Sequence, residues 1–248
     1  MQGNHGHIVL VTGDAPYLGG ALTWAPLRHA APEFEFVEVD ILNVSEAASL
    51  FVAARASIIR ALQGARAIVA HGTAATIAVE AVSLVDPSIP VLLLSPRIIT
   101  RMSLPLRLIR TIVGGGLGAS MLTAFARSKH RRLLTDQSYI RKQLKLLVRD
   151  DVISDELLRE ASRRIADSRT EIAVRRTSEI LRSVLTPIDA QANEAVLHRA
   201  VLIGSGPLDR KSRAQGEAIV IDGAWSAPML ETPNAVAEHL RTLVGPNK

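Results

Sequence analysis

The chain has 248 residues, of which 48% are hydrophobic, and a formal net charge of +5, which suits one large α/β domain or two small ones with a sizeable core. It contains no cysteine, which excludes disulfides, thiolate metal sites and cysteine nucleophiles. Because no uninterrupted apolar run is long enough to span a bilayer and the first residues do not resemble a secretory leader, we expect a cytoplasmic protein.

The first hundred residues alternate between strand and helix patterns. Residues 7–12 form a continuous apolar run, followed by a glycine-rich turn and a helical pattern at 21–31. Further strands are predicted at 34–40, 67–70 and 90–94, and further helices at 45–64, with Ser45 as N-cap, and at 73–85. Hydrophobic strands alternating with helices predict a parallel sheet that is covered on both faces.

The middle of the chain has a different pattern. From residue 101 to about 196 the sequence predicts only helical segments, at 103–127, 136–149, 154–167 and 169–185. Strands return at 199–203 and 218–222, and a last helix is predicted at 233–244. We therefore expect residues 1–99 and 197–248 to form an α/β core and residues 100–196 to form an all-helical insertion.

Positive charge is concentrated in this middle region. Residues 97–182 contain 19 basic and 9 acidic residues, whereas the rest of the chain contains 10 basic and 15 acidic residues. Such a block can attract a protein partner, an acidic ligand or an anionic membrane surface, or it can be a set of solvated helix faces. With two Trp, two Tyr and four Phe the chain offers no stacking platform, so nucleic acid is an unlikely partner.

Three stretches resemble the α/β-hydrolase fold family. They are "VTGDAPYLGGALTWAPL" after the first strand, "IVAHGTAA" at 68–75, and "DGAWSAPMLETPNAVAEHL" near the C-terminus. They resemble, in order, the segment with the first oxyanion-hole amide, the nucleophile elbow, and the tail that carries the catalytic histidine. The resemblance implies an α/β-hydrolase fold, a mostly parallel sheet flanked by helices, with the helical insertion as its cap.

The same resemblance implies that the catalytic triad is degenerate. Gly72 stands where the family has its nucleophilic serine, and Ser226 stands where it has its histidine. Asp209 lies two or three residues past the expected place of the acid. Three losses together argue against acyl transfer through this triad. A glycine at the elbow would also relieve the backbone strain that a serine bears there.

Other polar groups remain in the expected cleft. The resemblance implies binding positions at Gly13, Asp14, Gly72, Thr73, Trp225 and Ser226. Asp14 is the fallback catalytic residue, because a carboxylate in a half-buried cleft can act as general acid or base, although Asp is also common in turns. We expect His71 to pack between helix and strand. Neither metal-ligand spacing nor a dinucleotide or P-loop motif is present, so we expect no metal and no cofactor.

These observations support two hypotheses about function, which belong to different classes. The first is a non-hydrolytic accessory protein that binds a small apolar or anionic molecule in its cleft, or forms a complex with a protein through the cap. The alternative is an enzyme of altered chemistry on the same fold, a lyase, cyclase or cofactor-free acid/base catalyst. It would use Asp14 together with the old oxyanion hole, formed by the amides of Thr73 and Asp14. Attachment of the basic cap to an anionic membrane surface could accompany either function.

Overall fold

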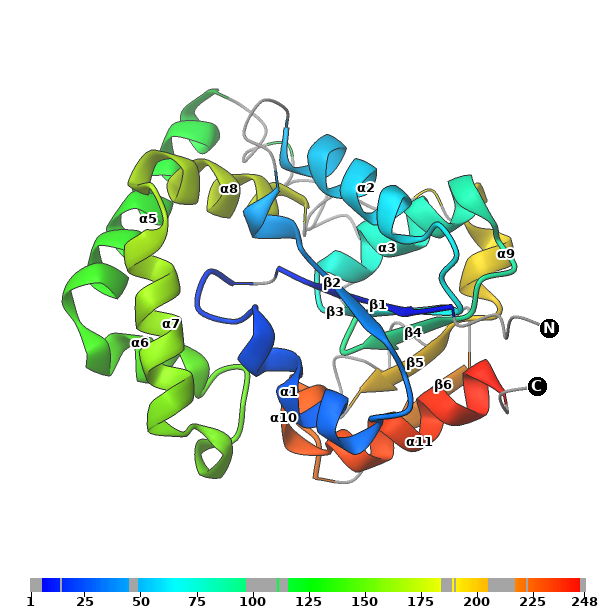
Figure 1. The fold of residues 1–248 in the computed structure, drawn as a ribbon. Coiled ribbons are helices and arrows are strands. Elements are labelled where there is room, and N and C mark those ends of the chain that lie inside the picture. The colour runs from blue at the N-terminus through cyan, green and yellow to red at the C-terminus, as the bar shows by residue number, and fades with distance from the viewer. Residues whose placement is uncertain are drawn as a thin grey trace.

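The computed structural model describes residues 6–13, 15–44, 49–96, 111, 116–183, 189, 191–204, 217–221 and 223–245. Within these residues six strands form one parallel sheet in the order β2-β1-β3-β4-β5-β6 (Figure 1). The strands are β1 (Ile8–Thr12), β2 (Phe36–Asp40), β3 (Ala67–His71), β4 (Val91–Leu94), β5 (Val201–Gly204) and β6 (Glu217–Val220). The predicted parallel sheet is confirmed, and each strand lies within about two residues of its expected range.

Helices cover both faces of the sheet, as the apolar strands require. One face is covered by α2 (Leu50–Ala61), α3 (Ala74–Val85) and the short α9 (Glu194–Leu197). The other is covered by α1 (Ala21–Ala30), α10 (Pro228–Glu231) and α11 (Pro233–Val244). Alternate residues of β1 serve the two layers: Ile8 belongs to the α1 and α11 side, and Val9 to the α2 and α3 side.

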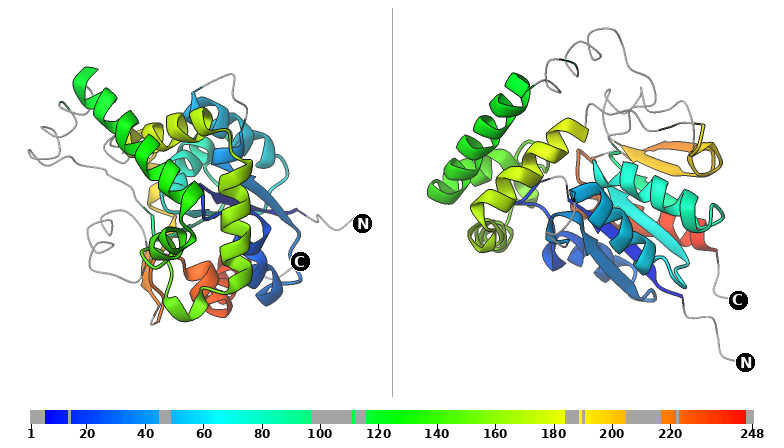
Figure 2. Two further views of the ribbon diagram at one scale, coloured as in Figure 1. Left: turned by 90° about the vertical axis from the view of Figure 1, so that its left-hand side faces the viewer. Right: turned by 90° about the horizontal axis from the view of Figure 1, so that it is seen from above.

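The cap lies to one side of this core (Figure 2). It consists of α5 (Gly116–Thr135), α6 (Gln137–Leu144), α7 (Asp155–Asp167) and α8 (Thr170–Ser183), with a 3-10 turn at Asp150–Val152. In the described part of residues 97–183 there is no strand, as predicted. No helix in the part of the chain that the structure describes is both long and apolar enough to cross a membrane.

The sequence of α7 shows why a cap helix forms and where it packs. Ser154 caps its N-terminus, accepting a hydrogen bond from the Leu157 N–H over 3.1 Å. Its buried residues follow helical spacing and join the same apolar cluster as Ile8; they are Leu157, Leu158, Ala161 and Ile165. The apolar core therefore runs from one face of the sheet into the cap without interruption.

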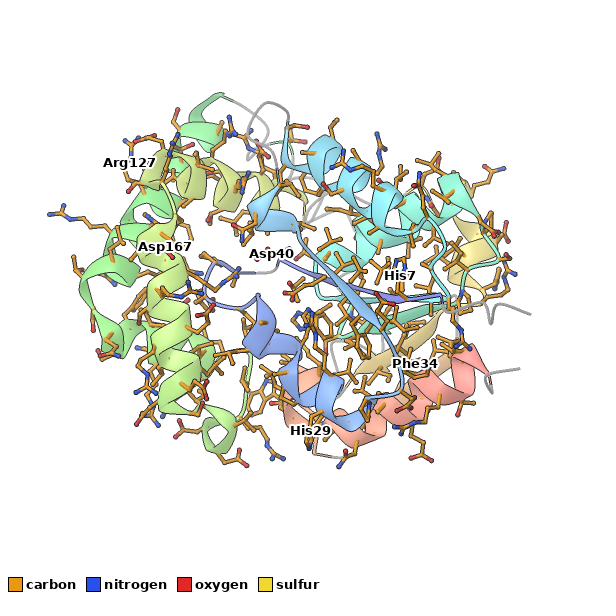
Figure 3. All side chains as sticks on the ribbon, viewed as in Figure 1. His7, His29, Phe34, Asp40, Arg127 and Asp167 are labelled. Carbon is orange, nitrogen blue, oxygen red and sulfur yellow. The ribbon has the colours of Figure 1, made fainter. Side chains whose placement is uncertain are left out.

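A buried ion pair also ties the cap to the core. Arg164 of α7 reaches Asp40 at the end of β2, and the two side chains are 13% and 8% exposed. Figure 3 labels Asp40 on the side of the sheet that faces the cap. Gly19 leaves room for this pair, because a Cβ atom there would lie 2.6 Å from the Arg164 guanidinium. Nearby, Glu179 of α8 accepts the Leu50 N–H at the start of α2 over 2.8 Å.

Several elements differ from the sequence prediction. The helix expected at 136–149 ends at Leu144, and the short helix α10 was not predicted. The cap helix expected to end near residue 127 continues to Thr135, because Lys and Arg are good helix formers. The single turn α9 was not predicted, since four residues are too short for a periodic signal. Ser45, the predicted N-cap, lies outside the described residues, and the helix that follows begins at Leu50 after Ser49.

Candidate functional site

A sharp strand-to-helix turn stands where the sequence predicts the elbow. β3 ends at His71 and α3 begins at Ala74. Between them Gly72 has φ +59°, in the left-handed region that costs a residue with a side chain roughly 1–2 kcal/mol. Its N–H donates to the Leu94 carbonyl oxygen over 2.9 Å, which fixes the turn against β4. The turn is present, and the residue at its tip carries no side chain that could attack a substrate.

Hydroxyl groups surround this turn at the carboxyl ends of three adjacent strands. Thr12 ends β1, Thr73 follows Gly72, and Ser95 follows β4, and their exposed fractions are 1%, 2% and 7%. Neighbouring strands lie about 4.8 Å apart, so these residues share one edge of the sheet. Ser95, which the sequence analysis does not single out, has φ +43° and is the non-glycine residue with positive φ in the described part of the chain.

His71 connects the turn to the tail loop. Its Nε2 lies 2.7 Å from the carbonyl oxygen of Ser226, so this nitrogen carries the hydrogen and donates it. The ring is 1% exposed. The buried imidazole thus links the two loops by a hydrogen bond. Its burial agrees with the expected packed position. Ser226, at the family's histidine position, is held through its main chain.

The tail loop is fixed at a second point. The Glu231 carboxylate accepts the Trp225 N–H and, over 2.8 Å, the Arg149 N–H at the start of the 3-10 turn in the cap. The Trp225 side chain is 56% exposed, so it lies at the surface and does not form a buried wall. The Glu231 carboxylate therefore links this loop to the cap.

Gly13 directly follows the first strand, as predicted, and the structure has no room for a Cβ atom there. Its φ is +150°, and a Cβ atom there would lie 1.9 Å from Cγ1 of Ile41. Asp14 and Asp209 lie outside the described residues. The structure thus brings Gly13, Gly72, Thr73 and the Ser226 loop to the same end of the sheet, with the two predicted carboxylates left as predictions.

A cavity of about 250 Å³ lies between the cap and the loop that follows Gly13 and Asp14. Its wall is mostly apolar and comes from residues 15–17, α5, α6, the residues just after α6, and α8. The polar groups of the wall are Tyr17, Lys129, His130, Gln143 and Thr177. A cavity of this kind, mostly apolar with a few polar groups, is typical of a small-molecule site.

His130 is the most unusual group in this wall. Its side chain is 3% exposed, and Nε2 has no hydrogen-bond partner within the described part of the chain. Burial lowers the pKa of His130 below its ordinary value, so the ring is neutral near pH 7. The Lys129 ammonium next to it lies 5.6 Å from the centre of the Tyr17 ring, in a cation–π contact.

A second cavity of about 390 Å³ adjoins the first, sharing Pro16 and Thr177. Its wall contains the guanidinium groups of Arg163, Arg164, Arg169 and Arg176. Glu160 and Asp40 pair with the first two of these, so carboxylates partly neutralise the wall. Asp167, labelled in Figure 3, lines the same cavity.

Sequence reasoning missed the cavity wall. His130 falls within "SKHRR", a stretch that reads as a solvated basic cluster. Its importance depends on Tyr17, more than a hundred residues earlier in the chain, which only the folded chain brings close. The one available signal is the phase of α5, which places Ala126, His130 and Leu133 on one face.

The fold is that of the α/β-hydrolases. The epoxide hydrolase CorEH superposes with a TM-score of 0.65 at 13% identity, covering 96% of this chain and 91% of its own. A hydrolase from Oleispira antarctica, olei00960, gives 0.59 at 13% identity, with 96% and 90% covered. AqDC, whose structure concerns recognition and ring cleavage of the Pseudomonas quinolone signal, gives 0.60 at 12% identity, with 96% and 92% covered. No protein-family model and no curated protein matches the sequence.

These comparisons correct the first functional hypothesis. A non-hydrolytic binding or accessory protein was the preferred interpretation of the degenerate elbow. Several structures that match nearly the whole chain instead carry enzymatic names: hydrolases, epoxide hydrolases, an esterase and a protein of ring cleavage. The binding-protein interpretation is therefore not retained.

Proposed function

We propose that the chain is an enzyme of altered chemistry on the α/β-hydrolase fold, a lyase, cyclase or cofactor-free acid/base catalyst that forms no acyl-enzyme. The observation that carries the proposal is the elbow itself: Gly72 keeps the turn at φ +59° without a nucleophile. Neighbours of the same fold with enzymatic names, matched over nearly the whole chain, support catalysis. Reactions that need a positioned base and a stabilised oxyanion, and no attacking side chain, fit such a site.

In this proposal each part of the site has a separate task. The amides of Thr73 and Asp14 stabilise negative charge that develops on a substrate oxygen. The Asp14 carboxylate transfers the proton. The cleft under the cap holds a small, largely apolar substrate and excludes water, since its wall is mostly apolar.

The first experiment tests whether an acyl-enzyme forms. Purified protein is incubated with p-nitrophenyl esters and with a fluorophosphonate probe, and modification is followed by intact-mass spectrometry. We expect neither turnover above the uncatalysed rate nor stoichiometric labelling. Stoichiometric labelling would show that a nucleophile acts at the site, and the proposal would be wrong.

The second experiment tests proton transfer directly. In 5-nitrobenzisoxazole, removal of the ring C–H proton breaks the N–O bond and releases a coloured cyanonitrophenolate, so absorbance reports on a general base. We expect the wild type to accelerate this ring opening and Asp14→Asn to lose most of the acceleration. Asp155→Asn, an exposed carboxylate at the start of α7, is the matched control and should retain it. Wild-type rates no higher than those of free carboxylate in solution would contradict the proposal.

A further inference from the structure

We propose that the cavity between the cap and residues 15–17 binds a compact apolar molecule through a weakly acidic hydroxyl group, a phenol or an enol, which His130 and Lys129 hold as its anion. The inference names a substrate class for the proposed enzyme and takes its catalytic meaning from that proposal. The binding itself can be measured without turnover.

The size and lining of the cavity determine the body of the ligand. A volume of about 250 Å³ is just below the usual range for ligand pockets, so the cavity suits a molecule with a single ring. Leu133, Leu147 and Ile180 come from three different parts of the cap and form an apolar surface around it. A strongly hydrated molecule such as a sugar would lose its water without replacement hydrogen bonds.

His130 sets the requirement for a hydrogen-bonding group on that ligand. A buried ring nitrogen without a protein partner costs free energy that a bound polar group can recover. Because the ring is neutral, one of its nitrogens keeps a lone pair that can accept a hydrogen bond or a proton from a hydroxyl group. This nitrogen contributes to neither the elbow nor the tail loop, where His71 makes the contact instead.

The charge of the wall determines the sign of the ligand. Three described wall residues are ionisable, Tyr17, Lys129 and His130, and none of the described wall residues is a carboxylate. A cation in the cavity would therefore be repelled by the ammonium group, whereas an oxyanion would be attracted to it. Lys129 is held over Tyr17, so its charge stays at the cavity.

The binding step is a proton transfer. The ligand O–H bond breaks, its proton forms an N–H bond on the His130 ring, and the oxygen keeps the electron pair. The new imidazolium and the Lys129 ammonium then both pair with the oxyanion, and this attraction offsets the cost of charging the buried ring. In the proposed enzyme such an anion is the activated form of the substrate.

The test uses 4-nitrophenol, because its anion absorbs at longer wavelength than the neutral form. At a pH about one unit below the pKa of the free phenol, adding wild-type protein should give a saturable rise in nitrophenolate absorbance. His130→Gln should weaken binding at least tenfold and remove the rise, and Lys129→Met should lower the ionised fraction. The exposed residues His29 and Lys142 supply matched controls, His29→Gln and Lys142→Met, which should behave like the wild type.

Each outcome decides the inference. It is overturned if the wild type gives no saturable change, if His130→Gln gives the same change, or if 4-nitroanisole, which has no acidic hydroxyl, competes equally well. If His130→Gln fails to fold, the His130 ring-proton shift in the wild type replaces it, and that shift must move on ligand addition. Binding without ring opening of 5-nitrobenzisoxazole would defeat the proposed function alone. Ring opening without phenol binding would defeat this inference alone.

Discussion

Two regions of the molecule, the carboxyl edge of the sheet and the cap, carry different kinds of chemistry. The sheet side, where this fold places a nucleophile and its histidine, holds a glycine turn and buried hydroxyls at Thr12, Thr73 and Ser95. The cap side holds a neutral imidazole and an ammonium group, at His130 and Lys129. The sheet edge thus has the turn geometry of the fold, while Lys129 and His130 lie on the cap helix α5.

This difference shows which side chains of a site can vary while the fold stays the same. Strand ends are positioned by the whole sheet, so Gly13 and Gly72 keep unusual backbone angles that depend on Ile41 and Leu94. A cap helix is positioned mainly by its own apolar stripe, which leaves its other residues free to vary. Acid/base groups are therefore easier to gain on the cap than at the sheet edge, provided that the cap stays in place.

The largest expected effect concerns what holds the cap in place. Arg164→Met removes the partner of Asp40 and leaves a buried carboxylate, 8% exposed, without its counter-charge. Breaking such a pair costs about 3–5 kcal/mol, so the free energy of unfolding in urea should fall by that amount. In the exposed pair Arg127 and Glu171, 58% and 78% exposed, Arg127→Met should cost less than about 1 kcal/mol. Equal losses in the two variants would mean that the buried pair does not secure the cap.

The second prediction concerns the sheet edge at Gly13. Gly13→Ala puts a methyl group 1.9 Å from the Ile41 side chain at φ +150°, so overpacking adds to backbone strain. We expect a loss of at least about 2 kcal/mol in the free energy of unfolding. Gly64→Ala serves as a control that measures backbone strain alone. Gly64 has φ +75°, and nothing lies within 4 Å of the place that a methyl group would take there. This substitution should lower the free energy of unfolding by about 1 kcal/mol. A Gly13 variant no less stable than the Gly64 variant would refute the packing argument.

The third prediction concerns the elbow. Gly72→Ser places a side chain at φ +59° and should lower the free energy of unfolding by about 1–2 kcal/mol. It should not react rapidly with a fluorophosphonate, because a serine hydroxyl is a weak nucleophile without a base beside it and Ser226, at the family's histidine position, offers no imidazole. Ser226→His in addition should help only modestly. Rapid stoichiometric labelling of Gly72→Ser would show that a base survives at the sheet edge, which would erase the contrast between the two sides.

The sheet edge could be predicted from the sequence because its signals are local. Apolar runs bounded by turns predicted the strands, and the order of "IVAHGTAA" and the tail motif predicted the position of the Gly72 turn. The hydrogen bond between His71 and Ser226 could not be predicted from local signals, since 155 residues separate the two in the sequence. The same is true of Arg164 and Asp40, which look like ordinary exposed charges in the sequence.

The cap cavity could not be predicted, because its residues come from four segments that no motif links. Tyr17 lies just after the first strand, His130 on α5, Gln143 on α6 and Thr177 on α8. Each alone fits a common surface or core position. Only the packing of α5 against α8 and of the cap against residues 15–17 makes them one wall, and helix periodicity does not encode those contacts.

The smallest expected effect is the pH dependence of stability that His130 introduces. Burial lowers the pKa of His130 in the folded protein below its ordinary value of 6.5, so on acidification the unfolded chain takes up this proton first. The stability contributed by the neutral ring is fully present above about pH 6.5 and is lost as the pH falls from there toward the folded-state pKa. His130→Gln cannot titrate, so its free energy of unfolding between about pH 7.5 and 5.5 should fall less steeply than that of the wild type. His29→Gln, at an exposed site, should keep the wild-type slope. Identical slopes for wild type and His130→Gln would show that the ring is solvated in the folded protein, and the cap side would then lack the neutral base that distinguishes it from the sheet edge.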